Sequence, residues 1–471
     1  MKKLYIMAAF VAVAAVTGAT QVYWVRVDAA PDQLFRTIPE ATLDVAASTP
    51  FDVDLIADDA DLTALRATRL PYRILESIDA SDAPPSEYTT YDELVVELNN
   101  LANTYPSICK LYDLGDSWEG RNILAVKISS NPAYADPNKK DILINGNHHA
   151  REIMTVEVPL YLAKKLCESY PADPDVKRIV ENVETWVLPM LNPDGHNYVF
   201  TTYNMWRKNR RDNGNNTYGV DLNRNYDYHW GEGGASHTPS SDTYCGPYAF
   251  SEPEVQALRD LINNSSHQFK YTLNYHSYGR HMLFPWAYTS AWVSEPDRSY
   301  YVSLAQYLLE TLPGWDYGND YTCLGYVASG NAVDWEYDGA GHAKVYGTTF
   351  EIDTSFQPPA SQIPITCNQQ YPVLLKLLKL GVCELPIEVT GFAAKAAAGA
   401  VRLSWEAHAN ADLAGFNLYR AEDGTGAGYV VVNGALIRGR SPFAYTDTAV
   451  QPGRTYKYIL EAVDVNGHTQ T

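Results

Sequence analysis

The chain has 471 residues, more than one ordinary domain holds, so its length predicts two or three folded units. Hydrophobic residues make up 46% of it, which excludes a disordered chain. The formal net charge is −20, from 36 Lys and Arg against 56 Asp and Glu, which argues against nucleic acid and anionic membranes as partners.

The first twenty residues have the pattern of an export signal. Lys2 and Lys3 precede an apolar run from Leu4 to Val16, and small residues follow it. The run is shorter than the roughly 20 apolar residues that cross a bilayer, and no later segment meets that length. We therefore expect residues 1–20 to be a signal peptide and the protein to be secreted (extracellular or periplasmic) with no membrane span. A buried N-terminal helix is the alternative.

Residues 21–85 form a small acidic segment with a strand-like stretch at 51–56 and a helix-like stretch at 61–69. It ends at 81–86 in Ser-Asp-Ala-Pro-Pro-Ser, a composition typical of an exposed linker. A small α+β unit between a signal peptide and a linker predicts a pro-segment. A permanent N-terminal domain is the alternative.

Residues 86–385 alternate between short apolar runs and helical stretches. Ser251 and Glu254 have the spacing of a capping box before the third helical stretch. Interleaved strands and helices predict an α/β domain with a mostly parallel or mixed central sheet and helices on both faces. The apolar runs lie at 123–128, 142–144, 186–191, 271–275 and 345–350, and the helical stretches at 91–104, 156–170, 252–263 and 298–311.

Beyond residue 385 the helical pattern stops, and strand-like stretches are separated by turns rich in Gly, Asn and Asp. This predicts an all-β sandwich over residues 386–471 with a short or missing final strand. The domain resembles a fibronectin type III domain, with Trp405 in its core and Tyr456 where such sandwiches turn a corner. Contact with a surface or polymer is one role open to it. The stretches lie at 401–405, 415–419, 429–432 and 455–463.

Six cysteines lie at positions 109, 167, 245, 323, 367 and 383, without a CxxC pair. Export makes disulfides available to them, and their spacing argues against a thiolate zinc site or a redox motif. Cys367 and Cys383 flank one helical stretch and are candidates for a local bridge. Six cysteines allow fifteen pairings, and the spacing does not select one.

The most informative stretch is 144–152, Ile-Asn-Gly-Asn-His-His-Ala-Arg-Glu, which places His149 and Glu152 at the end of a buried strand. In α/β sheets, ligands bind beyond the strand ends. A His and a Glu at this spacing reach one metal ion from a turn that enters a helix, and catalytic zinc often takes two His and one Glu, with water in the fourth position. The same spacing recurs at His229 and Glu232, but that copy lies among glycines with no strand before it, so we reject it.

Two further strand ends supply candidates for a third ligand and a base. The run 271–278 contains His276, and the run 345–351 ends in Glu351. A buried carboxylate such as Glu351 is costly without a partner, so its position favours a function. A satisfied polar histidine and a solvated strand end are the alternatives.

The ordered set His149-x-x-Glu152, His276 and Glu351 resembles the zinc carboxypeptidases of the pancreatic carboxypeptidase A and bacterial carboxypeptidase T kind. The resemblance covers about residues 86–385. It implies a metallocarboxypeptidase that hydrolyses the C-terminal peptide bond of peptides and proteins. Further landmarks follow in the family's order: Asn192-Pro193-Asp194-Gly195, Trp206-Arg207-Lys208, Asp221-Leu222-Asn223-Arg224-Asn225, and Tyr326 ahead of Asp334-Trp335.

The resemblance assigns roles to the reacting groups. His149, Glu152 and His276 would hold one Zn²⁺ per catalytic domain, and its bound water would have a pKa near 7. Glu351 would act as general base on that water and then pass the proton to the leaving amine. Arg207 would stabilise the oxyanion of the tetrahedral intermediate. Taken alone, Arg207 belongs to a basic run of the kind that forms a solvated surface.

The resemblance also implies how the substrate is held. Asn223 and Arg224 would bind its terminal carboxylate, since the planar fork of Arg suits bidentate contact. Tyr326 would close over it from a mobile loop. Arg151 and Tyr278 would be secondary substrate contacts.

Specificity depends on the position just before the Asp-Trp pair, which in this family separates hydrophobic from basic preference. That residue is Val333, so we predict hydrophobic or aromatic C-terminal residues as substrates. Asn331 and Ala287, also expected near the pocket, match neither pattern, and Asp338 is a source of unexpected acidity.

Residues 21–85 would cover the cleft until proteolysis near Ala83–Ser86, as an inhibitory pro-segment does. Two other functions stay open. One is a related metallopeptidase that cuts cell-wall peptides next to a D-residue. The other is a non-catalytic adhesion or binding protein, against which the complete set of ligands and base argues.

Overall fold

A computed structural model describes residues 21–39, 42–49, 51–214, 216–382, 388–397, 399–408, 413–423, 429–439, 441–464 and 469–470. The predicted signal peptide and Cys383 lie outside this set. No helix among the described residues is long and apolar enough to cross a membrane.

The N-terminal unit is a four-stranded antiparallel sheet with two helices, in the strand order β2-β3-β1-β4. Apolar residues that include Val25, Leu55 and Leu65 form its own core. Helix α2 begins at a capping box between Asp58 and Asp61. The small α+β region expected before the main domain is therefore confirmed. Its elements are β1 (Gln21–Val27), α1 (Pro31–Phe35), β2 (Asp44–Ser48), β3 (Val53–Ala57), α2 (Asp59–Thr68) and β4 (Tyr72–Asp79).

The central sheet has eight strands in the order β11-β10-β12-β9-β7-β8-β6-β5. The pairs β7–β8, β7–β9, β9–β12 and β10–β11 are parallel and the others antiparallel, so the sheet is mixed, as predicted. Its strands are β5 (Cys109–Asp116), β6 (Asn122–Ile128), β7 (Lys140–Gly146), β8 (Val183–Leu188), β9 (Phe269–Ser277), β10 (His281–Leu283), β11 (Asp316–Gly318) and β12 (Tyr346–Ile352).

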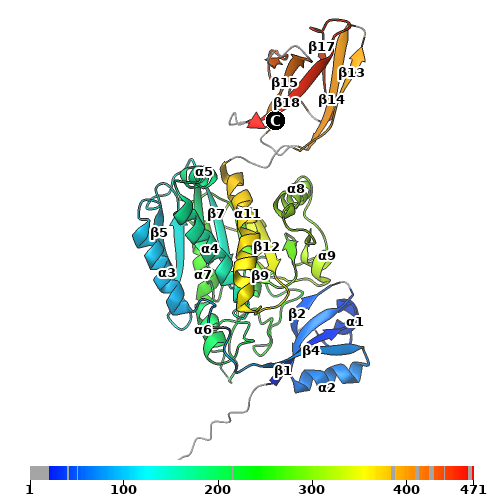
Figure 1. The fold of residues 1–471 in the computed structure, drawn as a ribbon. Helices are drawn as coiled ribbons and strands as arrows, with labels where there is room; N and C mark the ends of the chain where they lie inside the picture. The colour runs from blue at the N-terminus through cyan, green and yellow to red at the C-terminus, as the bar shows by residue number, and fades with distance from the viewer. Residues whose placement is uncertain are drawn as a thin grey trace, which may run out of the picture.

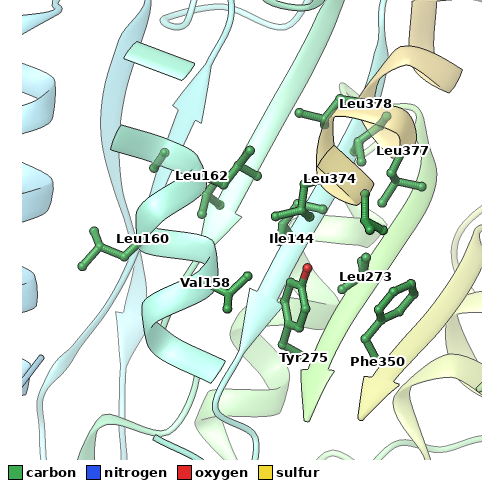
Figure 2. Close-up of a cluster of buried hydrophobic side chains, with 14 of the residues drawn as sticks. Ile144, Val158, Leu160, Leu162, Leu273, Tyr275, Phe350, Leu374, Leu377 and Leu378 are labelled. Carbon is green, nitrogen blue, oxygen red and sulfur yellow. The ribbon is translucent and has the colours of Figure 1, made fainter. Parts of the chain in front are cut away.

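Both faces of this sheet are buried. Leu143 and Ile144, adjacent on β7, belong to different cores, because successive side chains of a strand point to opposite faces. Figure 2 shows Ile144 and its neighbours on β9 and β12 facing the apolar side chains of α4 and α11. The helices are α3 (Tyr91–Thr104), α4 (Met154–Ser169), α5 (Pro174–Asn182), α6 (Pro193–Thr201), α7 (Pro253–Asn263), α8 (Asp297–Leu309), α9 (Asp320–Leu324), α10 (Ala332–Asp338) and α11 (Ile363–Val382), with 3-10 turns η2 (Leu222–Arg224) and η3 (Ala360–Gln362).

The predicted capping box at α7 is wrong. The helix begins at Pro253, and its N-cap is Glu252, which makes no side-chain cap hydrogen bond. Ser251 Oγ instead donates to the Glu252 carboxylate at 2.6 Å, and the Glu254 carboxylate accepts from the backbone N–H of Trp118 at 3.2 Å. Both side chains are buried, and Ser251 Oγ also accepts from Asn225 Nδ2 at 2.9 Å, so tertiary partners replace the local cap.

The C-terminal domain is built of two antiparallel sheets, β13-β14-β17 and β16-β15-β18-β19, and Figure 1 shows it beyond the C-terminal end of α11. Trp405 packs between Phe416 and Phe443 in its core. The Tyr456 hydroxyl accepts a hydrogen bond from Gln451 N at 3.0 Å. The all-β prediction is confirmed. The strands are β13 (Glu388–Ala397), β14 (Ala400–His408), β15 (Leu413–Glu422), β16 (Val430–Val431), β17 (Phe443–Asp447), β18 (Tyr456–Asp464) and β19 (Thr469–Gln470).

The five described cysteines are buried, and none of them forms a disulfide with another. Cys109 and Cys167 lie side by side as thiols that share a hydrogen bond. Cys383, the second residue of the candidate bridge from Cys367, lies outside the described residues.

Candidate functional site

The candidate site lies at the carboxyl ends of β7, β9 and β12, which are neighbours in the sheet. β7 ends at Gly146, where a Cβ would lie 2.1 Å from the backbone oxygen of Thr155, so only glycine lets the chain turn this closely against α4. Asn147 follows in the left-handed region (φ 61°), and its side chain donates to the backbone oxygens of His149 and Ala150. This turn carries His149 and Glu152 into the crevice beyond the strand ends.

The structure brings His149, Glu152 and His276 together. His149 Nδ1 lies 2.7 Å from Glu152 Oε1, His276 Nδ1 lies 3.1 Å from Glu152 Oε2, and the two Nδ1 atoms are 3.1 Å apart. All three side chains are buried. Burial lowers the pKa of His276, which favours the neutral imidazole that binds metals. Burial alone would raise the pKa of Glu152, but the two histidines lower it overall and keep it ionised.

Asp221 supports this group from behind. Its Oδ1 lies 3.1 Å from His149 Nε2, and its Oδ2 accepts from Arg207 Nη2 at 2.8 Å. Burial opposes its charge, but Arg207 and His149 hold its pKa well below the usual range. A carboxylate on the far nitrogen of a metal-binding histidine fixes the ring and its tautomer. The adjacent His148 turns away and meets the Tyr226 hydroxyl at 2.8 Å.

Glu351 stands beside His276, because the two residues are in register on the parallel strands β12 and β9. Burial raises the pKa of Glu351 well above its ordinary value, and the nearby Glu152 and Asp320 add to that effect. Arg207 and Arg224 act in the opposite direction. A raised pKa makes the carboxylate a stronger proton acceptor, as the role of general base requires.

One cavity contains these groups together with the predicted substrate contacts. Asn223 and Arg224 enter it from the 3-10 turn η2, and Tyr326 follows α9. Val333 lies behind the cavity, in a buried cluster with Ala287 and Ala328. The predicted ligands, the base and the substrate-contact residues Arg207, Asn223, Arg224, Tyr278 and Tyr326 all line the cavity.

Two of the predicted substrate contacts, Arg151 and Tyr278, also meet the N-terminal unit. The Arg151 guanidinium forms a two-point ion pair with Asp44, with Nη2 to Oδ1 at 2.6 Å. The Tyr278 hydroxyl donates to Asp54 at 3.0 Å. Val45, Ala46 and Ala47 of β2 line the same cavity as the zinc-type ligands.

The second His-x-x-Glu pair, which we rejected as a metal site from the sequence, makes contacts of its own. His229 and Glu232 contact each other at 2.9 Å, and the His229 ring stacks on Tyr288. Among the described residues, no further histidine, cysteine or carboxylate completes a metal-binding group with them.

A family profile described as zinc carboxypeptidase matches residues 94–373, more than half of the chain. The chain belongs to the zinc carboxypeptidase family. Carboxypeptidase B of Astacus astacus is 35% identical over 61% of this chain and 94% of its own length, and carboxypeptidase A1 of Bos taurus is 33% identical over 62% and 70%. The solved structure of a carboxypeptidase A from Helicoverpa armigera has a TM-score of 0.67 at 24% identity, covers 77% of this chain and 98% of its own, and shows the shared fold.

Zinc carboxypeptidases are metallopeptidases, and the residues present here fit the metal. Two imidazole nitrogens and one carboxylate are the donor set of a catalytic zinc site, and they converge within hydrogen-bonding distance of one another. His276 Nε2 is buried without a partner in the described chain, so the ring's contacts concentrate on its Nδ1 side.

Sequence reasoning missed four contributors. Asp221 was named only as part of a family landmark, although it orients His149 from 72 positions away in sequence. Asp44 and Asp54 belong to an acidic segment, and no motif there distinguishes them from the other carboxylates. Asp320, buried in the cavity wall, was not considered. In each case the role depends on tertiary contacts, which no local motif encodes.

Proposed function

We propose that the protein is an exported zinc carboxypeptidase that hydrolyses the C-terminal peptide bond of peptides and proteins. The observation that carries the proposal is the convergence of His149, Glu152 and His276 beside Glu351, in a cavity that also holds Arg207 and Arg224. Export itself rests on residues 1–20, which lie outside the described structure.

The residues divide the chemistry between them. Bound zinc would supply a Lewis acid that polarises the scissile carbonyl and lowers the pKa of water. Glu351 accepts the proton of the attacking water and returns it to the leaving amine. The Arg207 guanidinium, held in place by Asp221, faces the negative charge that develops on the carbonyl oxygen.

The residues of the cavity support binding of the C-terminal end of a peptide. Arg224 and Asn223 would hold the terminal carboxylate, and Tyr326 would cover the bound residue. Ala287, Ala328 and Val333 give the pocket an apolar, small-residue base that favours hydrophobic or aromatic C-terminal side chains. Release of Phe from hippuryl-Phe should exceed release of Arg from hippuryl-Arg, and a clear reversal would refute this preference.

The activity is tested on full-length folded protein after limited proteolysis within residues 81–86. We expect this protein to release C-terminal Phe from a short L-peptide and to lose the activity with a zinc chelator. Zinc binding without release from any L-peptide would favour a cell-wall substrate with a D-residue. Absence of bound zinc would favour a non-catalytic binding protein.

Residues 21–85 would act as an inhibitory pro-segment. Asp44 forms an ion pair with Arg151, and Asp54 accepts the hydrogen bond of the Tyr278 hydroxyl, so neither residue is free to contact a substrate. Residues of β2 also line the cavity. The connecting residues Ser81–Ala83 are exposed, as a cleavage site must be. We expect the uncleaved protein to be inactive, and full activity before cleavage would refute this role.

The C-terminal domain would be a fibronectin type III-like sandwich. Its three- and four-stranded sheets, its buried Trp405 and the hydrogen bond of Tyr456 at the corner before β18 support this assignment. Contact of this domain with a surface or polymer stays a prediction.

A further inference from the structure

A group of metal-ligating side chains lies at the edge of the central sheet, outside the cavity of the proposed catalytic site. His281 is the first residue of β10, Asp316 is the first residue of β11, and Cys323 lies in α9. One nitrogen, oxygen or sulfur atom from each lies within 4.8 Å of the other two. None of the three residues lines the cavity that contains Glu351. The group is therefore separate from the predicted catalytic zinc site.

The backbone brings the three donors together. β10 and β11 are parallel, and His281 and Asp316 are in register, so that His281 Nδ1 contacts the Asp316 carboxylate. α9 approaches β11 at Gly318, where a Cβ would lie 2.3 Å from Thr322 Oγ1 and 3.1 Å from Cys323 Sγ. A glycine in this strand thus leaves room for the thiol beside the two strand residues.

The described chain supplies no permanent positive charge to this group. The Asp316 carboxylate pairs with His281, and no Lys or Arg among the described residues forms an ion pair with it. Cys323 is buried, and burial raises the pKa of its thiol to about 12, so the sulfur keeps its proton in the absence of a cation. A divalent cation would compensate the carboxylate and displace the thiol proton to solvent. The ion, the carboxylate and the thiolate then carry no net charge together.

A cavity of about 190 Å³ connects the group with its surroundings. His281 and Gly279 line this cavity, together with residues of the N-terminal unit that include Asp54. A Cβ at Gly279 would lie 2.4 Å from the His281 ring, so this glycine leaves the ring its place in the cavity wall. The Asp316 side chain is 61% exposed and thus accessible to a hydrated ion. An ion can therefore reach the group and keep a water ligand.

The donor types select the class of metal. An imidazole nitrogen and a thiolate suit Zn²⁺, whereas Ca²⁺ and Mg²⁺ take oxygen ligands. We propose that His281, Asp316 and Cys323 bind a second Zn²⁺, with water in the fourth position of a tetrahedral site. The ion ties α9, and with it the segment that leads to Tyr326, to β10 and β11. This site goes beyond the proposed carboxypeptidase activity and does not depend on it.

Cobalt distinguishes the two sites, because a thiolate ligand gives bound Co²⁺ a charge-transfer band in the near ultraviolet. The donor set of the proposed catalytic site, two histidines and one glutamate, contains no sulfur. Folded full-length protein is freed of metal with a chelator, kept reduced with a phosphine and titrated with Co²⁺. We expect two Co²⁺ ions per chain, one of them with the thiolate band, and two Zn²⁺ ions per chain by elemental analysis.

Cys323→Ser should abolish the thiolate band and lower the bound Co²⁺ from two ions to one. His281→Asn keeps the thiol and changes a partly exposed residue, so it serves if Cys323→Ser does not fold. Loss of a partner behind a ligand already costs about 10- to 100-fold in metal affinity, so loss of this ligand should weaken the second site at least about 100-fold. Cys367→Ser is the matched control, because Cys367 is also a buried thiol and belongs to no metal-binding group among the described residues. It should leave the band and both ions unchanged.

The outcomes separate the second site from the proposed function. One Co²⁺ per chain without the band, or a band that survives Cys323→Ser, overturns the second site while the proposed catalytic zinc stands. One Co²⁺ per chain with a band that Cys323→Ser removes supports the second site and refutes metal binding by the proposed catalytic residues.

Discussion

The two ends of the central sheet carry the same kinds of side chain and use them in opposite ways. At the carboxyl ends of the strands, His149, Glu152 and His276 converge. At the amino ends, Asp141 of β7, Glu184 of β8 and His267 before β9 form a second group whose ligand atoms are equally close. Figure 1 shows the N-terminal unit at the carboxyl end only. Residue type alone therefore does not distinguish a metal site from a structural cluster.

The difference lies in what else each group contacts. At the amino end, Lys127 Nζ forms an ion pair with Glu184 at 2.7 Å, and Asp141 accepts from Trp186 Nε1 at 2.9 Å and from Gln268 N at 2.6 Å. The carboxylates there are neutralised by groups of the protein itself, which leaves little negative charge for a metal ion. At the carboxyl end, the contacts of the Glu152 carboxylate with described residues are to His149, His276 and one backbone N–H. A group that its own surroundings leave undercompensated is the one available to a cation.

The largest expected effect separates the two ends by activity. Glu351→Gln should lower kcat for C-terminal Phe release by about 10²- to 10⁴-fold, because the amide cannot accept the proton of water. Glu184→Gln makes the same change in a buried glutamate of β8 and should leave kcat unchanged while it lowers stability, since Lys127 then lacks its anionic partner. Rate assays and thermal unfolding of both variants decide this. Equal losses of kcat would mean that the two ends are not functionally distinct.

The next effect concerns metal affinity. Asp221→Asn weakens the support of His149 and should reduce zinc affinity about 10- to 100-fold, measured by competition with a chromophoric chelator. Asp141→Asn alters a carboxylate that contacts His267 in the corresponding way at the amino end, at 3.0 Å. The zinc affinity of the Asp141→Asn variant should equal that of wild type. A loss in Asp141→Asn would show that the amino-end cluster binds zinc as well.

The carboxyl-end half of this contrast was accessible from sequence, and the reason that the amino-end half was not is physical. The spacing at His149 and Glu152, and the strand-end positions of His276 and Glu351, are local features, so the four residues were selected correctly as neighbours. Helix α3 begins and ends at the predicted residues because its apolar periodicity is strong. The catalytic and ligand roles of the four residues stay predictions.

What sequence reasoning could not find depends on the fold. The histidine that Asp221 contacts comes from a distant segment, and the contacts of Asp44 with Arg151 join two domains. The amino-end cluster was not seen at all, because Asp141, Glu184 and His267 share no motif. The capping box at α7 failed for the same reason, since Asn225 and Trp118, from distant segments, bind Ser251 and Glu254.

The smallest expected effect is the pH dependence of stability at the amino end. Burial alone would raise the pKa of Asp141, but hydrogen bonds from His267, the Gln268 N–H and Trp186 lower it overall. A folded pKa below the unfolded value, about 3.9, means that ionised Asp141 contributes stability above pH 4 and that this contribution is lost as the pH falls through the folded pKa.

The advantage of wild type over Asp141→Asn should therefore be constant from pH 7 to about 5 and shrink below about 4, where a protonated Asp141 resembles the amide. Hydrogen exchange of the β7 and β8 amides in a urea series at several pH values measures the difference without interference from the other domains. The carboxyl end does not contribute to this difference, because both proteins keep His149, Glu152 and His276. An advantage that grows in acid would mean that Asp141 is held in its protonated form. The amino-end cluster would then not be a self-neutralised counterpart of the predicted zinc site.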